Sequence, residues 1–269
     1  MGKSVKDRLR RLGIKPTKSL GQNFLEDTNI AKKIVDSANI TASDKILEIG
    51  PGLGVLTDFI IERARKTILI EKDEGITSYL EGRYSSHEIN IIQGDVLEVE
   101  LPEFDRVVSN LPFSISSPVT FKLLNSDFKM GILTYQKQFA ERMVAEVGDD
   151  EYSRLSVMVS VYAEVDKLFN ISKECFYPPP RIDATVIRLI PSEPAFDLEN
   201  EELFSTVVKE LFNYRRKKIK NALKIGLDMK VEKIPYGDKR VGNISPEQIN
   251  EIVNHLIEEK TITEDITTH

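Results

Sequence analysis

The sequence contains no tryptophan, one cysteine and three histidines. A single Cys175 cannot form a disulfide within the chain, and His87, His255 and His269 have no zinc-ligand spacing with it or with one another. No apolar stretch reaches the about 18 uninterrupted residues of a membrane span, and the N-terminal residues lack the apolar core of a signal peptide. We therefore expect a cytoplasmic protein without a metal site or a membrane segment.

Acidic residues outnumber basic ones, and the formal net charge is -6 at pH 7. A uniformly acidic surface would repel nucleic acid. Lys and Arg are nevertheless concentrated in residues 1–20 and in residues 213–224 (NYRRKKIKNALK), the second of which contains no acid. One such run is usually a solvated helix face, but two in an acidic chain leave phosphate binding open as an equal alternative.

Between residues 28 and 112, amphipathic helical runs alternate with short β-branched runs, which is typical of a mostly parallel sheet in an α/β fold. We expect strands at 45–50, 67–72, 89–95, 105–110 and 129–136. We expect helices at 28–40, 55–64, 117–126 and 137–148. Segments 155–165 and 184–190, separated by a proline-rich loop, could pair antiparallel and add a mixed edge to the sheet.

The stretch from Pro191 to Pro194 indicates a linker. After it only helical patterns occur, including a Ser245 N-cap followed by Pro246. We therefore predict one domain over residues 1–190, with a basic N-terminal arm, and a small all-helical domain over residues 191–269.

A glycine-rich loop at residues 50–54 lies between a predicted strand and a predicted helix, and Glu71 ends the next strand. Such a loop can be a simple tight turn, but a carboxylate at the next strand end favours a nucleoside site. Val55 stands where a dinucleotide fingerprint has its third glycine, so S-adenosylmethionine fits better than a pyrophosphate ligand. Asp95 could accept a hydrogen bond from an adenine amine, although an isolated acid there is more often a cap.

The strand at 105–110 ends in Asn110, followed by Leu111, Pro112 and Phe113. An adenine amine is a poor nucleophile because its lone pair is delocalised into the ring. The side-chain oxygen of Asn110 and the main-chain carbonyl of Leu111 could accept its two N–H groups and favour the pyramidal form. Pro112 stiffens the loop, and Phe113 offers a stacking face. An ordinary turn with Phe113 in the core is the alternative.

In this order and spacing the sequence resembles the ribosomal RNA adenine dimethyltransferase family. The resemblance rests on SLGQNFL (19–25), LEIGPGLGVLT (47–57), NLPFSISSP (110–118), YSRLSVM (152–158), FYPPPRIDATVIRL (176–189) and FNYRRKKIKNAL (212–223). It implies a Rossmann-like class I methyltransferase sheet, mostly parallel with one antiparallel edge strand, and an all-helical C-terminal domain. It also implies methyl transfer from S-adenosyl-L-methionine to two adjacent adenines near the 3′ end of small-subunit rRNA, by a monomer acting on the pre-ribosomal small subunit.

The resemblance also assigns residues to roles. The implied cofactor residues are Asn23, Leu25, Gly50, Glu71, Asp95 and Asn110. Phe113 and Phe176 are implied to face each other across the target base, although Phe176 is almost equally well explained as a core aromatic. The basic N-terminal arm and the helix expected at 213–224 are expected to contact rRNA phosphates, the latter through Arg215, Arg216, Lys217, Lys218 and Lys220.

Three departures from the family pattern bear on substrate positioning only: Phe113 where many members have Tyr, Ser153 in place of Gly, and Arg181-Ile182 in place of Lys-Val.

Two other functions stay open. A ribosome assembly factor could use the same fold without catalysis, and a nicotinamide oxidoreductase is disfavoured by Val55.

Overall fold

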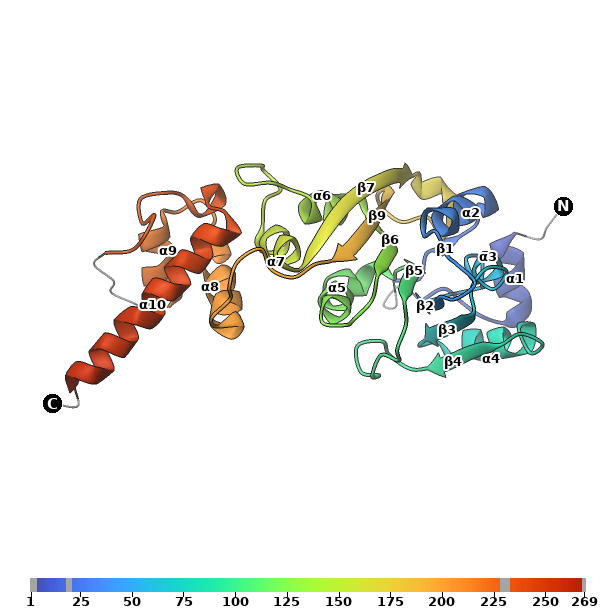
Figure 1. The fold of residues 1–269 in the computed structure, drawn as a ribbon. Helices are drawn as coiled ribbons and strands as arrows, with labels where there is room; N and C mark the ends of the chain where they lie inside the picture. The colour runs from blue at the N-terminus through green and yellow to red at the C-terminus, as the bar shows by residue number, and fades with distance from the viewer. Residues whose placement is uncertain (1–3, 18–20, 228–232, 268–269) are drawn as a thin grey trace. The chain divides into compact units, whose positions relative to one another are not determined.

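The computed structural model describes residues 4–17, 21–227 and 233–267, with Ser19 and Leu20 of the SLGQNFL motif outside the described residues. Contacts divide the chain into two units (Figure 1). The first comprises Met1–Ala140 with Glu164–Pro191, and the second comprises Glu141–Ala163 with Ser192–His269. Residues 141–163, which the sequence prediction assigned to the first domain, therefore group with the second unit.

The first unit is built on a seven-stranded sheet with strand order β4-β3-β2-β5-β6-β9-β7. Its strands are β2 (Lys45–Ile49), β3 (Lys66–Glu71), β4 (Ile89–Gln93), β5 (Arg106–Asn110), β6 (Met130–Gln136), β7 (Ala163–Ile171) and β9 (Ala184–Pro191). The pairs from β4 to β6 are parallel, and β9 runs antiparallel to β6. The predicted mostly parallel α/β fold is therefore confirmed.

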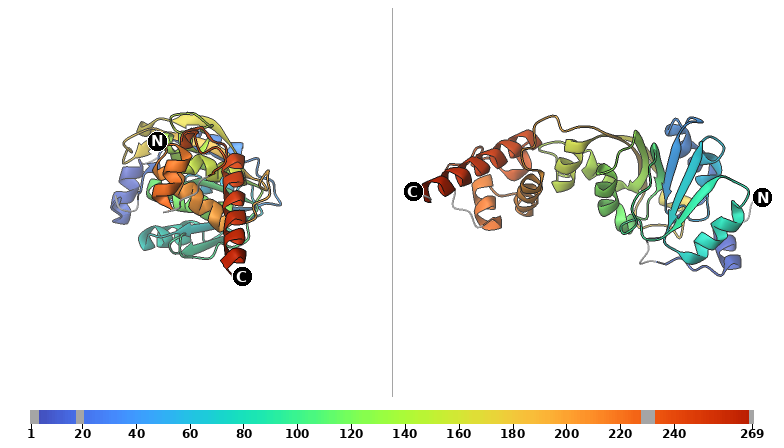
Figure 2. Two further views of the ribbon diagram at one scale, coloured as in Figure 1. Left: turned by 90° about the vertical axis from the view of Figure 1, so that its left-hand side faces the viewer. Right: turned by 60° about the horizontal axis from the view of Figure 1, so that its bottom comes forward.

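Helices cover both faces of this sheet (Figures 1 and 2). They are α1 (Val5–Leu12), α2 (Thr28–Ser37), α3 (Thr57–Ile60), α4 (Glu74–Arg83) and α5 (Ser116–Leu124), with 3-10 turns η2 (Phe113–Ile115) and η3 (Lys173–Cys175). Helix α6 (Lys137–Met143) follows β6 and includes residues of both units. Because both faces are covered, successive residues of the central strands are buried, as in Leu47, Ile68 and Leu69.

The crossover helix expected at 55–64 is shorter than predicted, since only α3 has α-helical geometry. Helical i→i−4 hydrogen bonds run from Asp58→Gly54 to Ala64→Ile60, but i→i−3 bonds such as Phe59→Leu56 interrupt them. These tighter bonds convert both ends of the expected helix into turns.

A second, two-stranded sheet joins segments that are far apart in the chain. Its strands β1 (Phe24–Leu25) and β8 (Phe176–Tyr177) pair antiparallel. Asn23 Nδ2 donates to the Pro178 carbonyl at 2.6 Å, and the Glu26 N–H donates to the Cys175 carbonyl at 2.8 Å. The segment around Asn23 is thus fixed by the segment around Phe176.

The predicted antiparallel pairing of 155–165 with 184–190 is wrong for most of the first segment. Residues 154–162 form helix α7 (Arg154–Tyr162), and only the residues from Ala163 onward form β7. A capping box explains the difference, because Ser153 and Ser156 satisfy the first backbone groups of the helix reciprocally.

The described part of the second unit is mainly helical. Beside α7 it contains α8 (Glu201–Asn213), α9 (Ile219–Gly226), α10 (Pro246–Thr267) and the 3-10 turn η4 (Val241–Asn243). Its core residues include Phe204, Val207, Leu211, Ile249 and Val253, all fully buried. Among the described helices, none combines the length and the apolarity that a bilayer crossing requires.

Candidate active site

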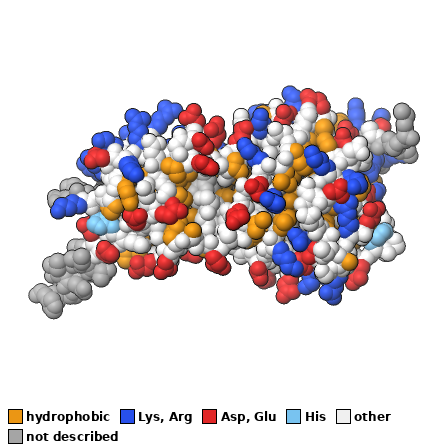
Figure 3. Space-filling model, turned by 45° about the horizontal axis from the view of Figure 1, so that its top comes forward, with side chains coloured by type: hydrophobic (Ala, Val, Ile, Leu, Met, Phe, Trp, Pro, Cys, Tyr) orange, Lys and Arg blue, Asp and Glu red, His pale blue; other side chains and the backbone are white. Residues whose placement is uncertain are grey.

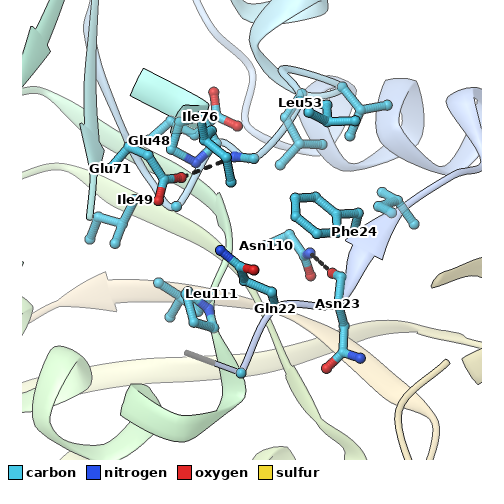
Figure 4. A pocket seen from close by; sticks show the side chains of 18 of the residues that line it. Gln22, Asn23, Phe24, Glu48, Ile49, Leu53, Glu71, Ile76, Asn110 and Leu111 are labelled. Atoms are coloured by element: carbon cyan, nitrogen blue, oxygen red, sulfur yellow. Dashed lines mark hydrogen bonds between the residues drawn. The ribbon is translucent and has the colours of Figure 1, made fainter. Parts of the chain in front are cut away.

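A cavity of about 460 Å³ lies at the carboxyl ends of β2, β3 and β5 (Figure 4). This edge is where open parallel sheets bind ligands. The structure brings all six predicted cofactor residues to its wall: Asn23, Leu25, Gly50, Glu71, Asp95 and Asn110. Leu111 and Pro112 also line the cavity, whereas Phe113 and Phe176 are not among its lining residues.

The glycine loop serves both the cavity and the packing behind it. Gly52 has a φ of +54°, and a Cβ there would lie 2.9 Å from the Phe24 ring on the cavity wall. Gly54 has a φ of +83°, and a Cβ there would overlap the Tyr84 hydroxyl. That hydroxyl lies 3.1 Å from the Gly54 carbonyl oxygen and 2.7 Å from the Asp58 carboxylate. Gly52 therefore keeps the cavity wall open, while Gly54 allows α4 to pack against the loop.

Glu71 places a buried carboxylate at the end of β3, with 7% of its surface exposed. Its oxygens accept the Asp73 N–H at 2.9 Å and the Gly52 N–H at 3.4 Å. Burial raises the pKa of Glu71 above its ordinary value, although these N–H donors oppose the shift. A carboxylate with two oxygens retains capacity to accept hydroxyl hydrogens from a ligand.

Asp95 is held in its charged form just after β4. Lys72 Nζ donates to one carboxylate oxygen at 2.6 Å, and the Leu97 N–H donates to the other at 2.9 Å. The Lys72 hydrogen bond is the main cause that lowers the pKa of Asp95. Asp95 is therefore a fixed anionic acceptor on the cavity wall.

Asn110 presents an unused acceptor at the tip of β5. Its Nδ2 donates to the Asn23 main-chain carbonyl at 3.1 Å, as the dashed line in Figure 4 marks. Its Oδ1 is buried and has no hydrogen-bond partner among the described residues. A buried acceptor without a donor costs roughly 1 to 3 kcal/mol. The amide is thus prepared to accept an N–H group from a ligand in the cavity.

Phe113 and Phe176 contact each other directly. Their ring centroids are 6.3 Å apart and their planes meet at 66°, an edge-to-face arrangement. Phe176 is 2% exposed and belongs to the hydrophobic core of the unit, and Phe113 packs against that core. Because no space separates the rings, a base could lie between them only if they moved apart, and stacking stays a prediction.

Glu48 is a cavity residue to which the sequence prediction gave no role. It is 1% exposed, and Thr57 Oγ1 donates to its carboxyl group at 2.6 Å. Burial raises the pKa of Glu48 to about 8. The available signal was an acid that stands between the apolar residues Leu47 and Ile49.

Helix α1 is also part of the site, through Val5, Arg8 and its N-cap residue Ser4. The sequence prediction treated this segment only as a basic arm. Its amphipathic spacing, with Val5 and Leu9 buried and the intervening residues charged, was the signal that could have revealed it.

The basic segment 213–224 is not one helix, as expected, because α9 begins only at Ile219. The backbone of the preceding residues bonds to another part of the chain. The Gly242 N–H donates to the Arg215 carbonyl and the Val241 N–H donates to the Lys217 carbonyl, both at 3.1 Å. Together with a turn closed by the Lys217 N–H, which donates to the Tyr214 carbonyl at 2.8 Å, these bonds separate α9 from the end of α8.

The basic side chains of this segment have different surroundings. Arg215 is half-buried, and its guanidinium donates to the Tyr152 carbonyl at 2.7 Å and to the Asp149 carbonyl. Lys218 and Lys220 both form ion pairs with Asp238, at 3.0 and 2.9 Å. Arg216 and Lys217 are exposed, and neither side chain has an ion pair within the described residues. Figure 3 shows Lys and Arg side chains gathered along one edge of the second unit.

A family model and the most similar relatives considered point to the same protein family. Residues 13–258 match the model of the ribosomal RNA adenine dimethylase family. The chain is 45% identical over 267 residues to the probable ribosomal RNA small subunit methyltransferase A of Thermococcus sibiricus, covering 94% of this chain and 97% of that protein. It is 42% identical over 262 residues to the protein of the same name from Methanothermobacter thermautotrophicus, covering 92% and 93%.

Solved structures agree with these relatives. A dimethyladenosine transferase from Plasmodium falciparum superposes with a TM-score of 0.77 at 30% identity, covering 88% of this chain and 98% of that one. The 23S rRNA methyltransferase ErmE superposes with a TM-score of 0.68 at 25% identity, covering 86% and 98%.

Proposed function

The chain belongs to the ribosomal RNA adenine dimethylase family, and on this premise we propose that it dimethylates the exocyclic amines of two adjacent adenines near the 3′ end of small-subunit rRNA. We propose S-adenosyl-L-methionine as the methyl donor. The observation that carries the proposal is the buried, unpartnered Oδ1 of Asn110 at the cavity. An adenine amine carries the kind of N–H donor that this oxygen lacks.

The residues present fit S-adenosylmethionine. The cofactor would be held by Asn23, Leu25, Gly50, Glu71, Asp95 and Asn110, all on the cavity wall. Buried Glu71 can accept ribose hydroxyl hydrogens, and anionic Asp95 can accept from an adenine amine. The loop lacks the third glycine of a dinucleotide site, since Val55 occupies that position. When bound, the cofactor supplies an electrophilic methyl group on a sulfonium.

Asn110 and Leu111 would act on the target amine by accepting its two N–H groups. Oδ1 of Asn110 takes one hydrogen bond and the main-chain carbonyl of Leu111 takes the other, which favours the pyramidal nitrogen of the transition state. The bond from Asn110 Nδ2 to the Asn23 carbonyl fixes the amide so that oxygen stays available to the ligand. No general base is needed, because the nitrogen becomes acidic once it is methylated.

Binding of the rRNA would depend on positive side chains in both units. Arg216 and Lys217 are exposed, and Lys218 and Lys220 can exchange Asp238 for phosphate oxygens. We propose that the enzyme acts as a monomer in the cytoplasm, on the pre-ribosomal small subunit, with Phe113 as a stacking face for the unstacked adenine.

The test is methyl transfer from labelled S-adenosylmethionine to small-subunit particles that lack these modifications, followed by digestion and mass spectrometry of the rRNA. We expect dimethyladenosine at two adjacent positions. Particle binding without any methyl transfer would support the non-catalytic assembly factor instead. A rise in melting temperature with NAD, but not with S-adenosylmethionine, would favour an oxidoreductase.

A further inference from the structure

Helix α1 packs against the wall of the cavity. Val5 and Leu9 are 7% and 2% exposed and pack in one hydrophobic cluster with Phe24 and Leu53. The Val5 backbone N–H donates to Glu26 Oε1 at 3.1 Å. The helix therefore lies against the part of the wall that the glycine loop and β1 form.

The two cationic side chains on the cavity wall differ in whether they have an ion-pair partner. The charged lining residues are Arg8, Glu26, Glu48, Glu71, Lys72 and Asp95. Of the two cations, Lys72 is bound to the Asp95 carboxylate at 2.6 Å. Arg8 is half-buried, and within the described residues its guanidinium has no hydrogen bond and no ion pair. The five N–H donors of this guanidinium thus have no acceptor among the residues that the structure describes.

We propose that Arg8 binds the carboxylate of the methionyl moiety of S-adenosylmethionine. This inference rests on the proposed function. Glu71 and Asp95 suit the hydroxyl and amine donors of a nucleoside, but neither can serve a carboxylate. A guanidinium matches a carboxylate with two parallel hydrogen bonds.

An RNA phosphate is the competing ligand for Arg8. The surroundings favour the carboxylate, because Arg8 shares the cavity wall with Glu71, whereas Lys6, Arg10 and Arg11 of the same helix are exposed. A polyanion would meet these three outer side chains first. Helix α1 would therefore use its inner face for the cofactor and its outer face for nucleic acid.

Two ligands that differ in the amino-acid moiety provide the test. Isothermal titration calorimetry would compare S-adenosylhomocysteine, which carries the carboxylate, with 5′-methylthioadenosine, which does not. We expect Arg8→Ala to weaken S-adenosylhomocysteine binding by about tenfold or more and to leave methylthioadenosine within about twofold. Arg8→Lys should lie between the two, because a lysine keeps the charge but not the paired donors.

Arg11→Ala is the matched control, since Arg11 is exposed on the same helix and should leave both affinities unchanged. Equal weakening of both ligands by Arg8→Ala would mean that α1 acts only as a wall, and weakening of neither would equally overturn the inference. Loss of rRNA affinity with an unchanged affinity for S-adenosylhomocysteine would identify Arg8 as a phosphate ligand. If the unmodified protein bound neither ligand, the proposed function itself would fail.

Discussion

The cavity of the first unit and the basic segment of the second unit relate sequence to function in opposite ways. In the cavity, Glu71, Asp95 and Asn110 are distant in sequence but line one wall, because parallel strands end at the same edge. In the segment 213–224, side chains that are adjacent in sequence have different surroundings. Arg215 is bound to main-chain carbonyls while Arg216 is exposed. Strand topology is therefore a better guide to a site than the number of charges in a run.

The sharpest test of the cavity is Asn110→Ala. We expect kcat to fall by about 10² to 10³, because an acceptor that acts in the transition state is lost. The dissociation constant of S-adenosylmethionine should rise by no more than about threefold, because the other five residues proposed to hold the cofactor remain. Single-turnover methyl transfer and calorimetry measure the two quantities. Ser114→Ala, an exposed change on the same cavity wall, is the control. A loss of cofactor affinity as large as the loss in kcat would contradict the role given to Asn110.

Glu71→Ala should show the opposite pattern. We expect cofactor affinity to fall by about 10- to 100-fold, as for lost hydrogen bonds to a charged group, while kcat at saturating cofactor stays within a few-fold. Burial raises the pKa of Glu71, so lowering the pH through that value should protonate the carboxylate and weaken cofactor binding. In Glu71→Gln, cofactor affinity should no longer fall as the pH is lowered. If affinity fell with pH in this variant as it does in the unmodified protein, another group would be responsible.

In the basic segment, the double variant Arg216→Glu, Lys217→Glu should weaken rRNA association by about tenfold. The slope of log affinity against log salt should flatten by about 0.7 to 0.9 for each phosphate that the protein no longer neutralises. Filter binding or fluorescence anisotropy at several salt concentrations measures both. An unchanged slope would remove these residues from the interface.

Arg215→Ala provides a comparison with that double variant. Because Arg215 donates to the carbonyls of Asp149 and Tyr152, its loss should lower the free energy of unfolding by roughly 1 to 3 kcal/mol and leave the salt slope unchanged. Denaturant titration followed by tyrosine fluorescence reports the first quantity. If the slope flattened as much as in the double variant, Arg215 would bind phosphate after all.

The smallest effect is expected for Glu48→Gln, as a difference of a few degrees in melting temperature. Burial raises the pKa of Glu48 from 4.5 to about 8, so between these values the folded protein holds a proton that the unfolded chain has released. Stability should therefore fall as the pH rises through this window and level off above it. Glu48→Gln should reduce that slope, as measured by thermal unfolding at pH 5 and pH 8. An identical slope in both proteins would mean that Glu48 is charged when folded.

The sequence predicted what depends on local pattern. The central strands follow from β-branched runs, and the structure places the ends of β2, β3 and β5, the glycine loop and Asp95 at the cavity. The pairing of β1 with β8 and the packing of α1 against Phe24 escaped prediction, because both depend on long-range packing. Segment 155–162 was wrongly predicted as a strand, since a β-branched apolar run fits a buried helix as well as a strand.

The bond between Asn23 and Pro178 has a consequence for how the protein is made. The two residues are 155 positions apart, and synthesis proceeds from the N-terminus. A nascent chain that has completed the glycine loop and Glu71 still lacks the strand that secures Asn23. Chains that end before Pro178 should therefore be unable to hold the methyl donor, whereas chains that extend beyond it contain both partners of the bond that fixes Asn23.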